Sequence, residues 1–137
     1  MPKIYKRKLD SKHFPEWLNR KENLHLANKI PPFSEGQIWW TAIGENVGVE
    51  INGKHNDFSR PVLIFKKFSN LCFLGIPLTS QFHEGSWYVE FEFKKKNQYA
   101  VLLQARMFSA ARLYNRMGKV STGDFKKIKT GFRKLTK

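Results

Sequence analysis

The sequence is poor in cysteine and in long apolar runs, and each shortage excludes a class of protein. Cys72 is the only cysteine among 137 residues, so no disulfide framework can form and a reducing cytoplasm is the expected setting. No apolar run approaches the roughly 18 residues that span a bilayer, so we expect no membrane insertion. The basic start is not followed by an apolar signal-peptide core, which argues against export.

Metal ligands and acidic residues are also scarce. The four histidines are scattered, and no group of Asp, Glu and His has metal-ligand spacing, so no metal or other cofactor is expected. Only 11 acidic residues face 25 lysines and arginines, which gives a formal net charge of +14. Self-repulsion of this size is tolerated mainly beside a polyanion or an acidic protein. Nucleic acid is therefore the leading partner, ahead of a membrane surface.

Residues 1–32 are predicted to form a basic helical extension in front of a main domain, 33–137. Pro15 fits a helix only in its first turn, and Pro31-Pro32 ends whatever precedes it. The apolar residues between these points recur at roughly helical spacing: Phe14, Trp17, Leu18 and Leu24. Hydrophobic residues form 41% of the chain, enough for one packed core.

Downstream of Gly36 the pattern changes to short runs rich in aromatic and β-branched residues, separated by turn-forming segments: 37–43, 61–66, 71–78, 87–93 and 99–104. Such a series of short strands predicts a mainly β fold, an antiparallel barrel. The run 87–93 alternates between apolar and polar side chains, so one of its faces should pack in the core. The run 71–78 is nearly all apolar and should be central.

The C-terminal part is predicted to contain a short helix from Ser109, a brief strand over 116–120 and a final helix after Ser121. Ser121 and Asp124 form a start that resembles a capping box. One face of the final helix is rich in lysine, and this face is either simply solvated or a contact for nucleic acid or an acidic antitoxin. The apolar residues of the helix fall on the face expected to pack on the barrel: Phe125, Ile128, Phe132 and Leu135.

Aromatic residues are more numerous than a small core obviously needs. Core packing accounts for most of them, whereas exposed ones could stack on unpaired bases. Trp39 and Trp40 are adjacent, so a strand would place them on opposite sides.

Five motifs follow one another between residues 33 and 137: GQIWWTAIGENVGVE, RPVLIFKKF, GIPLTS, LLQARMF and RMGKVS. In this order the chain resembles the PemK/MazF family of toxins of type II toxin-antitoxin systems. The resemblance implies a small SH3-like antiparallel β-barrel of the PemK/CcdB type with a C-terminal helix, to which the N-terminal helix is an addition. It further implies a homodimer, silenced by a cognate acidic antitoxin protein.

The resemblance also implies a metal-independent endoribonuclease that cuts single-stranded RNA, because RNA supplies its own 2′-hydroxyl nucleophile. Arg60 matches the arginine of the R-P-V motif and could fork onto two phosphate oxygens. Thr79 and Ser80 match the hydroxyl pair after P-L and could donate to a phosphate oxygen. Glu50 matches a loop glutamate that could act as a base or orient Arg60. These four residues are the catalytic candidates.

Four further residues are candidates for substrate binding: Lys54, His55, Gln104 and Arg106. Leu103 occupies the position where some members have an aspartate base, which leaves the identity of the base open. Two other functions therefore stay open, a barrel that binds RNA without cutting it and a protein-targeting poison of the gyrase-inhibitor type. Each site residue also has a simpler interpretation, as an exposed arginine, an ordinary turn residue or a solvated loop side chain.

Overall fold

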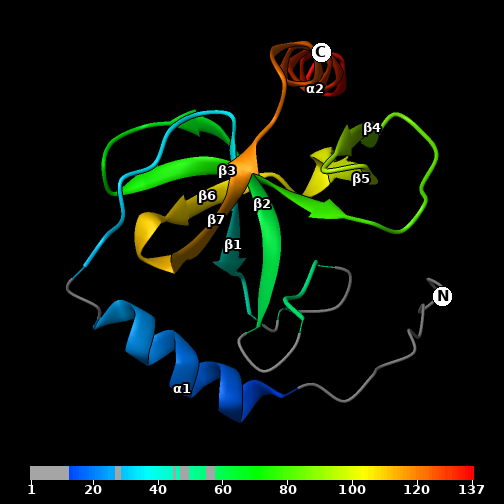
Figure 1. The fold of residues 1–137 in the computed structure, drawn as a ribbon. Helices are drawn as coiled ribbons and strands as arrows, with labels where there is room; N and C mark the ends of the chain where they lie inside the picture. The colour runs from blue at the N-terminus through cyan, green and yellow to red at the C-terminus, as the bar shows by residue number, and fades with distance from the viewer. Residues whose placement is uncertain (1–12, 27–28, 45, 47–49, 55–57) are drawn as a thin grey trace, which may run out of the picture.

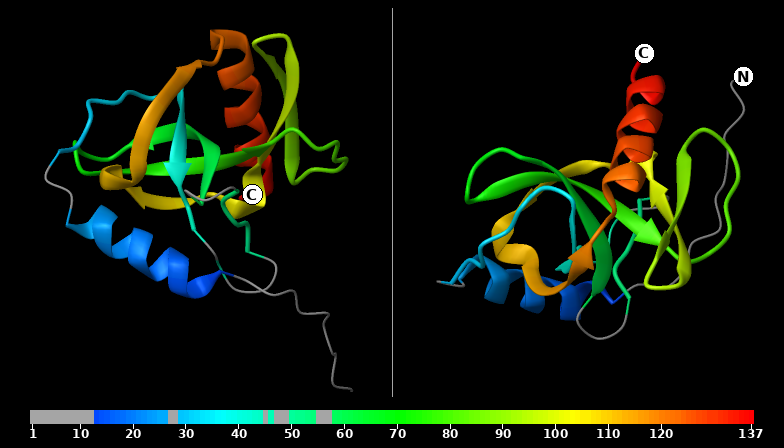
Figure 2. Two further views of the ribbon diagram at one scale, coloured as in Figure 1. Left: turned by 60° about the horizontal axis from the view of Figure 1, so that its bottom comes forward. Right: turned by 45° about the horizontal axis from the view of Figure 1, so that its top comes forward.

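The computed structural model describes residues 13–26, 29–44, 46, 50–54 and 58–137 (Figure 1). These residues contain two α-helices, which lie at opposite ends of the molecule (Figures 1 and 2), and one seven-stranded sheet. In chain order the elements are α1 (Phe14–His25), β1 (Gln37–Ala42), β2 (Ser59–Lys67), β3 (Cys72–Thr79), β4 (Tyr88–Phe93), β5 (Lys96–Val101), the 3₁₀ helix η1 (Leu102–Gln104), β6 (Arg106–Ser109), the 3₁₀ helix η2 (Ala110–Arg112), β7 (Leu113–Lys119) and α2 (Thr122–Leu135).

The strands pair antiparallel in the order β4-β5-β3-β2-β1-β7, and β6 also pairs with β3. Strand β3 therefore has three partners, which confirms the prediction that the apolar run 71–78 is central. Strands β1 to β5 overlap the five predicted runs, which their aromatic and β-branched residues indicated; burial alternates clearly only along β4.

The prediction of a closed barrel is wrong, because the sheet stays open between its end strands β4 and β7. Within the described strands these two share no backbone pairing; instead the ring of Phe93 on β4 packs against Gly118 on β7. Lys127 of α2 also reaches β4, where its Nζ donates to the carbonyl oxygen of Glu90 at 2.6 Å. Within the described strands, side-chain contacts rather than backbone hydrogen bonds thus join β4 to β7 and to α2.

Two local predictions in the second half of the chain also need correction, and one strand there was not predicted. The run 99–104 is displaced towards the C-terminus, because β5 spans Lys96–Val101 and η1 follows. The helix expected from Ser109 is only the 3₁₀ turn η2, in which the Ser109 hydroxyl accepts from the Ala111 N–H at 3.3 Å. Strand β6 has no predicted counterpart, since four residues are too few to show an alternating pattern.

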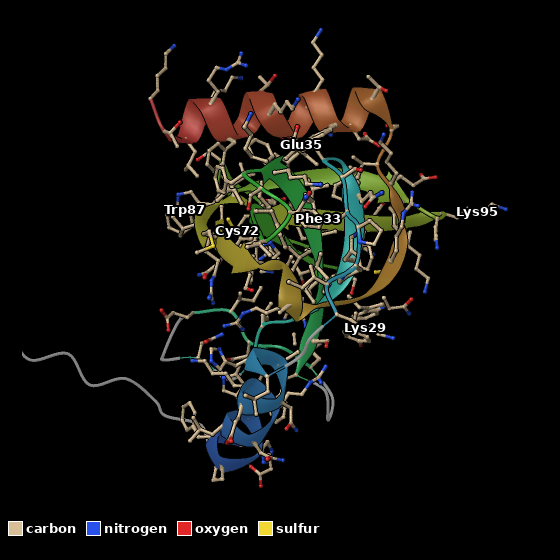
Figure 3. The ribbon with its side chains drawn as sticks, turned by 90° about the vertical axis from the view of Figure 1, so that its left-hand side faces the viewer. Lys29, Phe33, Glu35, Cys72, Trp87 and Lys95 are labelled. Carbon is tan, nitrogen blue, oxygen red and sulfur yellow. The ribbon has the colours of Figure 1, made fainter. Side chains whose placement is uncertain are left out.

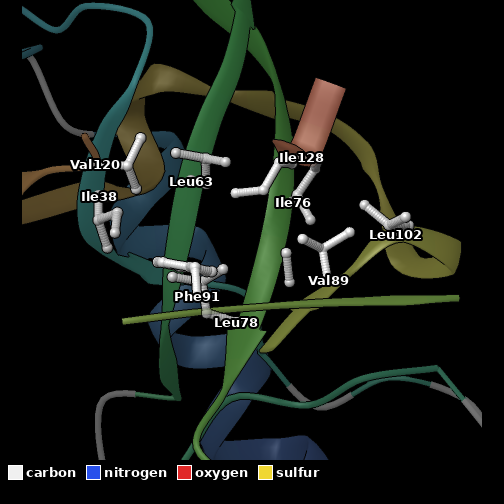
Figure 4. Packing of buried hydrophobic residues seen from close by; sticks show 10 residues of the cluster. Ile38, Leu63, Ile76, Leu78, Val89, Phe91, Leu102, Val120 and Ile128 are labelled. Atoms are coloured by element: carbon white, nitrogen blue, oxygen red, sulfur yellow. The ribbon is translucent and has the colours of Figure 1, made fainter. Parts of the chain in front are cut away.

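The sheet buries apolar side chains on both faces, and alternation along β2 divides them. Leu63 joins the cluster beneath α2, which Figure 4 shows: Ile38, Leu63, Ile76, Leu78, Val89, Phe91, Ala100, Leu102, Val120 and Ile128. Val62 and Ile64, which flank Leu63 in β2, belong to a second cluster on the other face of the sheet. Its members are Phe33, Trp39, Ile43, Val62, Ile64, Phe73, Phe108, Ala110 and Leu113. Trp39 is buried here, whereas Trp40 is half-buried.

Helix α2 begins as predicted, because the Ser121 hydroxyl accepts a hydrogen bond from the Asp124 N–H at 3.1 Å. Ser121→Ala removes the acceptor of this orphan N–H, and we expect the free energy of unfolding to fall by about 1 kcal/mol. Chemical denaturation would measure the difference. Thr122→Ala, one residue inside the helix, is the matched control, and an equal loss in both variants would contradict a capping role for Ser121.

Helix α1 has Pro15 in its first turn, as predicted. Trp17 and Leu24 are buried and pack with Ala42 and Phe58. Phe14 and Leu18, predicted on the same apolar stripe, are instead 42% and 62% exposed. Only a narrow part of the helix therefore contacts the sheet.

Candidate functional site

A hollow of about 380 Å³ opens where the start of β2 meets the end of β3 and the β4–β5 turn. Four cationic side chains line it: Lys54, Arg60, Lys94 and Lys96. The lining otherwise combines polar and apolar groups: Trp40, Pro61, Leu78, Thr79, Ser80, Phe93, Gln98 and Met117. None of these described lining residues is acidic, so this cationic hollow is suited to an anion.

Arg60, the second residue of β2, is fixed from behind by two backbone carbonyls. Its Nε donates to the Asn52 carbonyl oxygen at 2.8 Å, and a terminal nitrogen donates to the Leu78 carbonyl oxygen at 3.4 Å. A guanidinium has five N–H donors, so donors remain for a ligand. Partial burial lowers the pKa of Arg60. An arginine in proteins nevertheless stays charged at neutral pH, and here it can present a fixed fork to an oxyanion.

Thr79 and Ser80 stand at the end of β3, next to Arg60 across the sheet. The antiparallel β2–β3 register pairs Val62 with Pro77. Continued by two residues, back along β2 and forward along β3, this register places Arg60 opposite Thr79. The Thr79 hydroxyl oxygen accepts from the Gln81 N–H at 3.2 Å, which leaves its own proton to donate. The structure thus brings three of the four catalytic candidates together in one hollow with Lys54.

Tyr99 pairs with Thr79 across β3 and β5. Burial raises the pKa of the Tyr99 phenol, and the charge of Glu90 raises it further. The phenol therefore stays protonated at neutral pH and adds no negative charge beside the hollow.

Glu50, Gln104 and Arg106 lie apart from the cationic hollow and line a second, smaller cavity of about 60 Å³. Gln104 Oε1 accepts from the Ile51 N–H at 3.4 Å, and the Arg106 guanidinium lies 4.7 Å from the centre of the Phe108 ring. The two cavities have no described lining residue in common; Asn52, which follows Ile51 of the second cavity, holds Arg60 of the first through its carbonyl. His55 lies outside the described residues.

The β4–β5 turn supplies two hollow residues, Lys94 and Lys96, that the site prediction missed. Lys94 and Lys95 have φ angles of 50° and 64°, in the left-handed region that favours Gly or Asn in such turns. Lys95 projects away from the molecule (Figure 3). The run of three lysines was the available signal, but its position beside Arg60 depends on β5 pairing with β3.

The described residues contain no group of three or more His, Cys, Asp or Glu side chains that could hold a metal ion. Among the helices of the same part of the chain, none is long and apolar enough to cross a membrane.

Comparison with known proteins gives a family match and a set of similar folds. Residues 34–136 match the family described as PemK-like, MazF-like toxin of type II toxin-antitoxin system. No curated protein matches the chain in a direct search.

Three solved structures are similar in fold. The first is a mycobacterial endoribonuclease in complex with its cognate antitoxin, at 15% identity and a TM-score of 0.60, covering 77% of this chain and 95% of that one. The second is MazF from Deinococcus radiodurans, at 13% identity and 0.60, covering 80% and 98%. The third is Mycobacterium tuberculosis toxin MazF-mt6, at 11% identity and 0.55, covering 73% and 95%.

Proposed function

The chain belongs to the PemK-like, MazF-like toxin family of type II toxin-antitoxin systems, and from this premise we propose that it is an endoribonuclease that cuts single-stranded RNA without a metal ion. The observation that carries the proposal is the cationic hollow, in which Arg60 and the Thr79–Ser80 pair converge and no described lining residue is acidic. A phosphodiester is the anion that fits both the charge and the hydroxyl donors.

The proposed reaction is transfer of the phosphate to the neighbouring 2′-oxygen. The RNA 2′-oxygen gives its proton to Glu50 and attacks the adjacent phosphorus, while the bond from phosphorus to the 5′-oxygen breaks and the leaving oxygen takes a proton from water. Arg60 pairs with the two non-bridging oxygens as their charge grows, and the hydroxyls of Thr79 and Ser80 donate to the same group. The products are a 2′,3′-cyclic phosphate and a 5′-hydroxyl.

Glu50 is the proposed proton acceptor, although it lines the neighbouring cavity. It lies two residues before Asn52, whose carbonyl holds Arg60, and it is the one described carboxylate between β1 and β2. Gln104 and Arg106 line the same cavity, and we assign them, with Lys54 and His55, to binding nucleotides beside the scissile phosphate.

The protein partners follow from the same premise. One of the similar structures is a complex with a cognate antitoxin. A chain of net charge +14 offers an acidic antitoxin a strongly complementary surface, so we propose an acidic antitoxin as its protein partner. We further propose that the chain forms a homodimer, that the antitoxin binds this dimer, and that both act in the bacterial cytoplasm.

We expect the purified protein to cut a long single-stranded RNA at a recurring short sequence, equally well with and without EDTA. The physical reason is that the nucleophile belongs to the RNA and Arg60 supplies the charge that a metal would otherwise provide. Primer extension would map the cuts, and phosphatase and kinase treatment would identify the ends. A clear loss of cutting in EDTA would contradict the metal-independent mechanism.

Binding of RNA without cutting is the alternative function, and one observation favours it. Among the described residues, the lining of the cationic hollow holds no carboxylate and no histidine that could act as a general base beside Arg60. Intact RNA in the cleavage assay, together with salt-dependent binding, would select this alternative.

Charge in the hollow should set the salt dependence of binding. Replacing Lys54, Lys94 and Lys96 with glutamine should lower the slope of log affinity against log salt by about 0.7 for each lost phosphate contact. Binding would be measured on 2′-O-methyl RNA, which lacks the nucleophile. The control replaces three exposed α2 and C-terminal lysines, Lys126, Lys134 and Lys137. An equal fall in slope for both triple variants would show that overall charge, not the hollow, binds RNA.

A further inference from the structure

Helix α1 lies outside residues 34–136, the part of the chain that matches the toxin family. The structure nevertheless packs it against the segment that leads to Arg60. Trp17 is only 5% exposed, and its ring lies 5.6 Å from the ring of Phe58, which directly precedes β2. A side chain added at Gly44, just after β1, would overlap the Trp17 indole.

The residues beneath Trp17 form a narrow neck of backbone, made of Ile43, Gly44, Gly53 and Phe58. The Phe58 carbonyl oxygen accepts from the N–H groups of Ile43 and Gly44, both at 3.0 Å, and the Gly53 N–H donates to the Gly44 carbonyl oxygen at 2.7 Å. The neck is tight, because a side chain at Gly53 would overlap the Phe58 carbonyl. Gly44 at φ 86° and Phe58 at φ 56° are both in the left-handed region.

The neck ends at the candidate catalytic arginine. Asn52, the residue before Gly53, accepts from Arg60 Nε through its carbonyl, and Ser59 alone separates Phe58 from Arg60. Arg60 is thus tied to the neck both through its side chain and through the chain itself. Left-handed backbone in a residue other than glycine is strained and persists only where surrounding contacts hold it.

Arg112 holds the Trp17 ring from a further side. Its guanidinium lies 5.7 Å from the ring centre, and a terminal nitrogen donates to the Ala42 carbonyl oxygen at 3.0 Å. The indole is therefore packed between a cation, an aromatic ring and the Gly44 backbone. Such a contact set fixes the ring in one position.

We propose that Trp17 of the added N-terminal helix is a positioning residue of the site, which clamps the neck so that the Asn52 carbonyl stays on Arg60. The helix acts through this contact, although it lies outside the family domain and supplies none of the hollow's described lining residues. The effect on catalysis rests on the proposed ribonuclease function, whereas the effect on the neck does not. The test must therefore read both.

The experiment compares the full chain with Trp17→Ala, Trp17→Phe and Leu18→Ala, the last on an exposed residue of the same helix. Hydrogen exchange would follow the amides of Ile43, Gly44 and Gly53, and single-turnover cleavage of RNA would give the rate and the half-saturating concentration. We expect Trp17→Ala to exchange these amides at least 10-fold faster and to cut at least 10-fold more slowly, with little change in half-saturation. Trp17→Phe should recover most of the rate, and Leu18→Ala should match the parent.

Parental amide protection or a parental cutting rate in Trp17→Ala would overturn the proposal. An RNA left intact by the parent would refute the ribonuclease function, and the amide exchange alone would then decide whether Trp17 clamps the neck. Trp17→Leu replaces Trp17→Ala in both assays if the alanine variant does not fold, because it keeps an apolar side chain too small to cover Gly44 and Phe58 together.

Discussion

Arg60→Ala should lower the rate of RNA cleavage by at least about 100-fold, the usual effect of removing one preorganised donor to a developing oxyanion. Arg60 is the only guanidinium lining the cationic hollow within the described residues, and two carbonyls fix its orientation. Single-turnover kinetics at saturating RNA would measure the loss. The RNA should still bind, because the three lysines of the hollow remain.

Arg60→Lys separates charge from geometry in this prediction. Lysine keeps the positive charge but cannot reach Asn52, Leu78 and two phosphate oxygens at once, so we expect a rate between those of the parent and Arg60→Ala. Arg60 is only half-buried, so water can reach the released carbonyls and the free energy of unfolding should fall by no more than about 1–2 kcal/mol. A parental cutting rate in Arg60→Ala would remove this residue from the mechanism.

Phe73→Ala should have the largest effect on stability, lowering the free energy of unfolding by about 3–5 kcal/mol. Phe73, the second residue of β3, is fully buried, stacked on Phe108 at 5.6 Å and tilted against Phe33 at 5.4 Å. Alanine would leave a cavity between the rings of Phe33 and Phe108, which two other parts of the chain hold in place. Urea unfolding followed by tryptophan fluorescence would measure the loss.

Phe68→Ala is the matched control, since it replaces the same residue type in the loop between β2 and β3. Phe68 is 55% exposed, so its removal should change the free energy of unfolding by no more than about 0.5 kcal/mol. Equal losses in the two variants would contradict the assignment of Phe73 to the core.

The local features of the fold were accessible from the sequence because their causes act over a few residues. Alternation of side chains indicated β4, an apolar run indicated the central strand β3, and Ser121 with Asp124 indicated the start of α2. Short elements were missed for the same reason. The four-residue strand β6 forms because Phe108 pairs with Phe73 on β3. A pairing between residues this far apart cannot be predicted from a local sequence pattern.

The candidate site was predictable only in part. Arg60, Thr79 and Ser80 could be selected from motifs, and the β2–β3 register does bring them together. The assignment of Glu50, Gln104 and Arg106 to the same site did not anticipate that they line a separate cavity. Lys94 and Lys96 were missed, because a turn between two strands gains a place beside Arg60 only when β5 pairs with β3.

By itself the sequence determined the excess of positive charge, the two helices and the central strand, since each follows from composition or from a short-range pattern. It also carried the five motifs on which the family resemblance rests. The tertiary structure decided that the sheet stays open, that four cations share one hollow, and that Trp17 packs on Gly44. These features depend on strand order, register and the space left between side chains. All three are set by contacts between residues far apart in the chain, where local pattern carries no information.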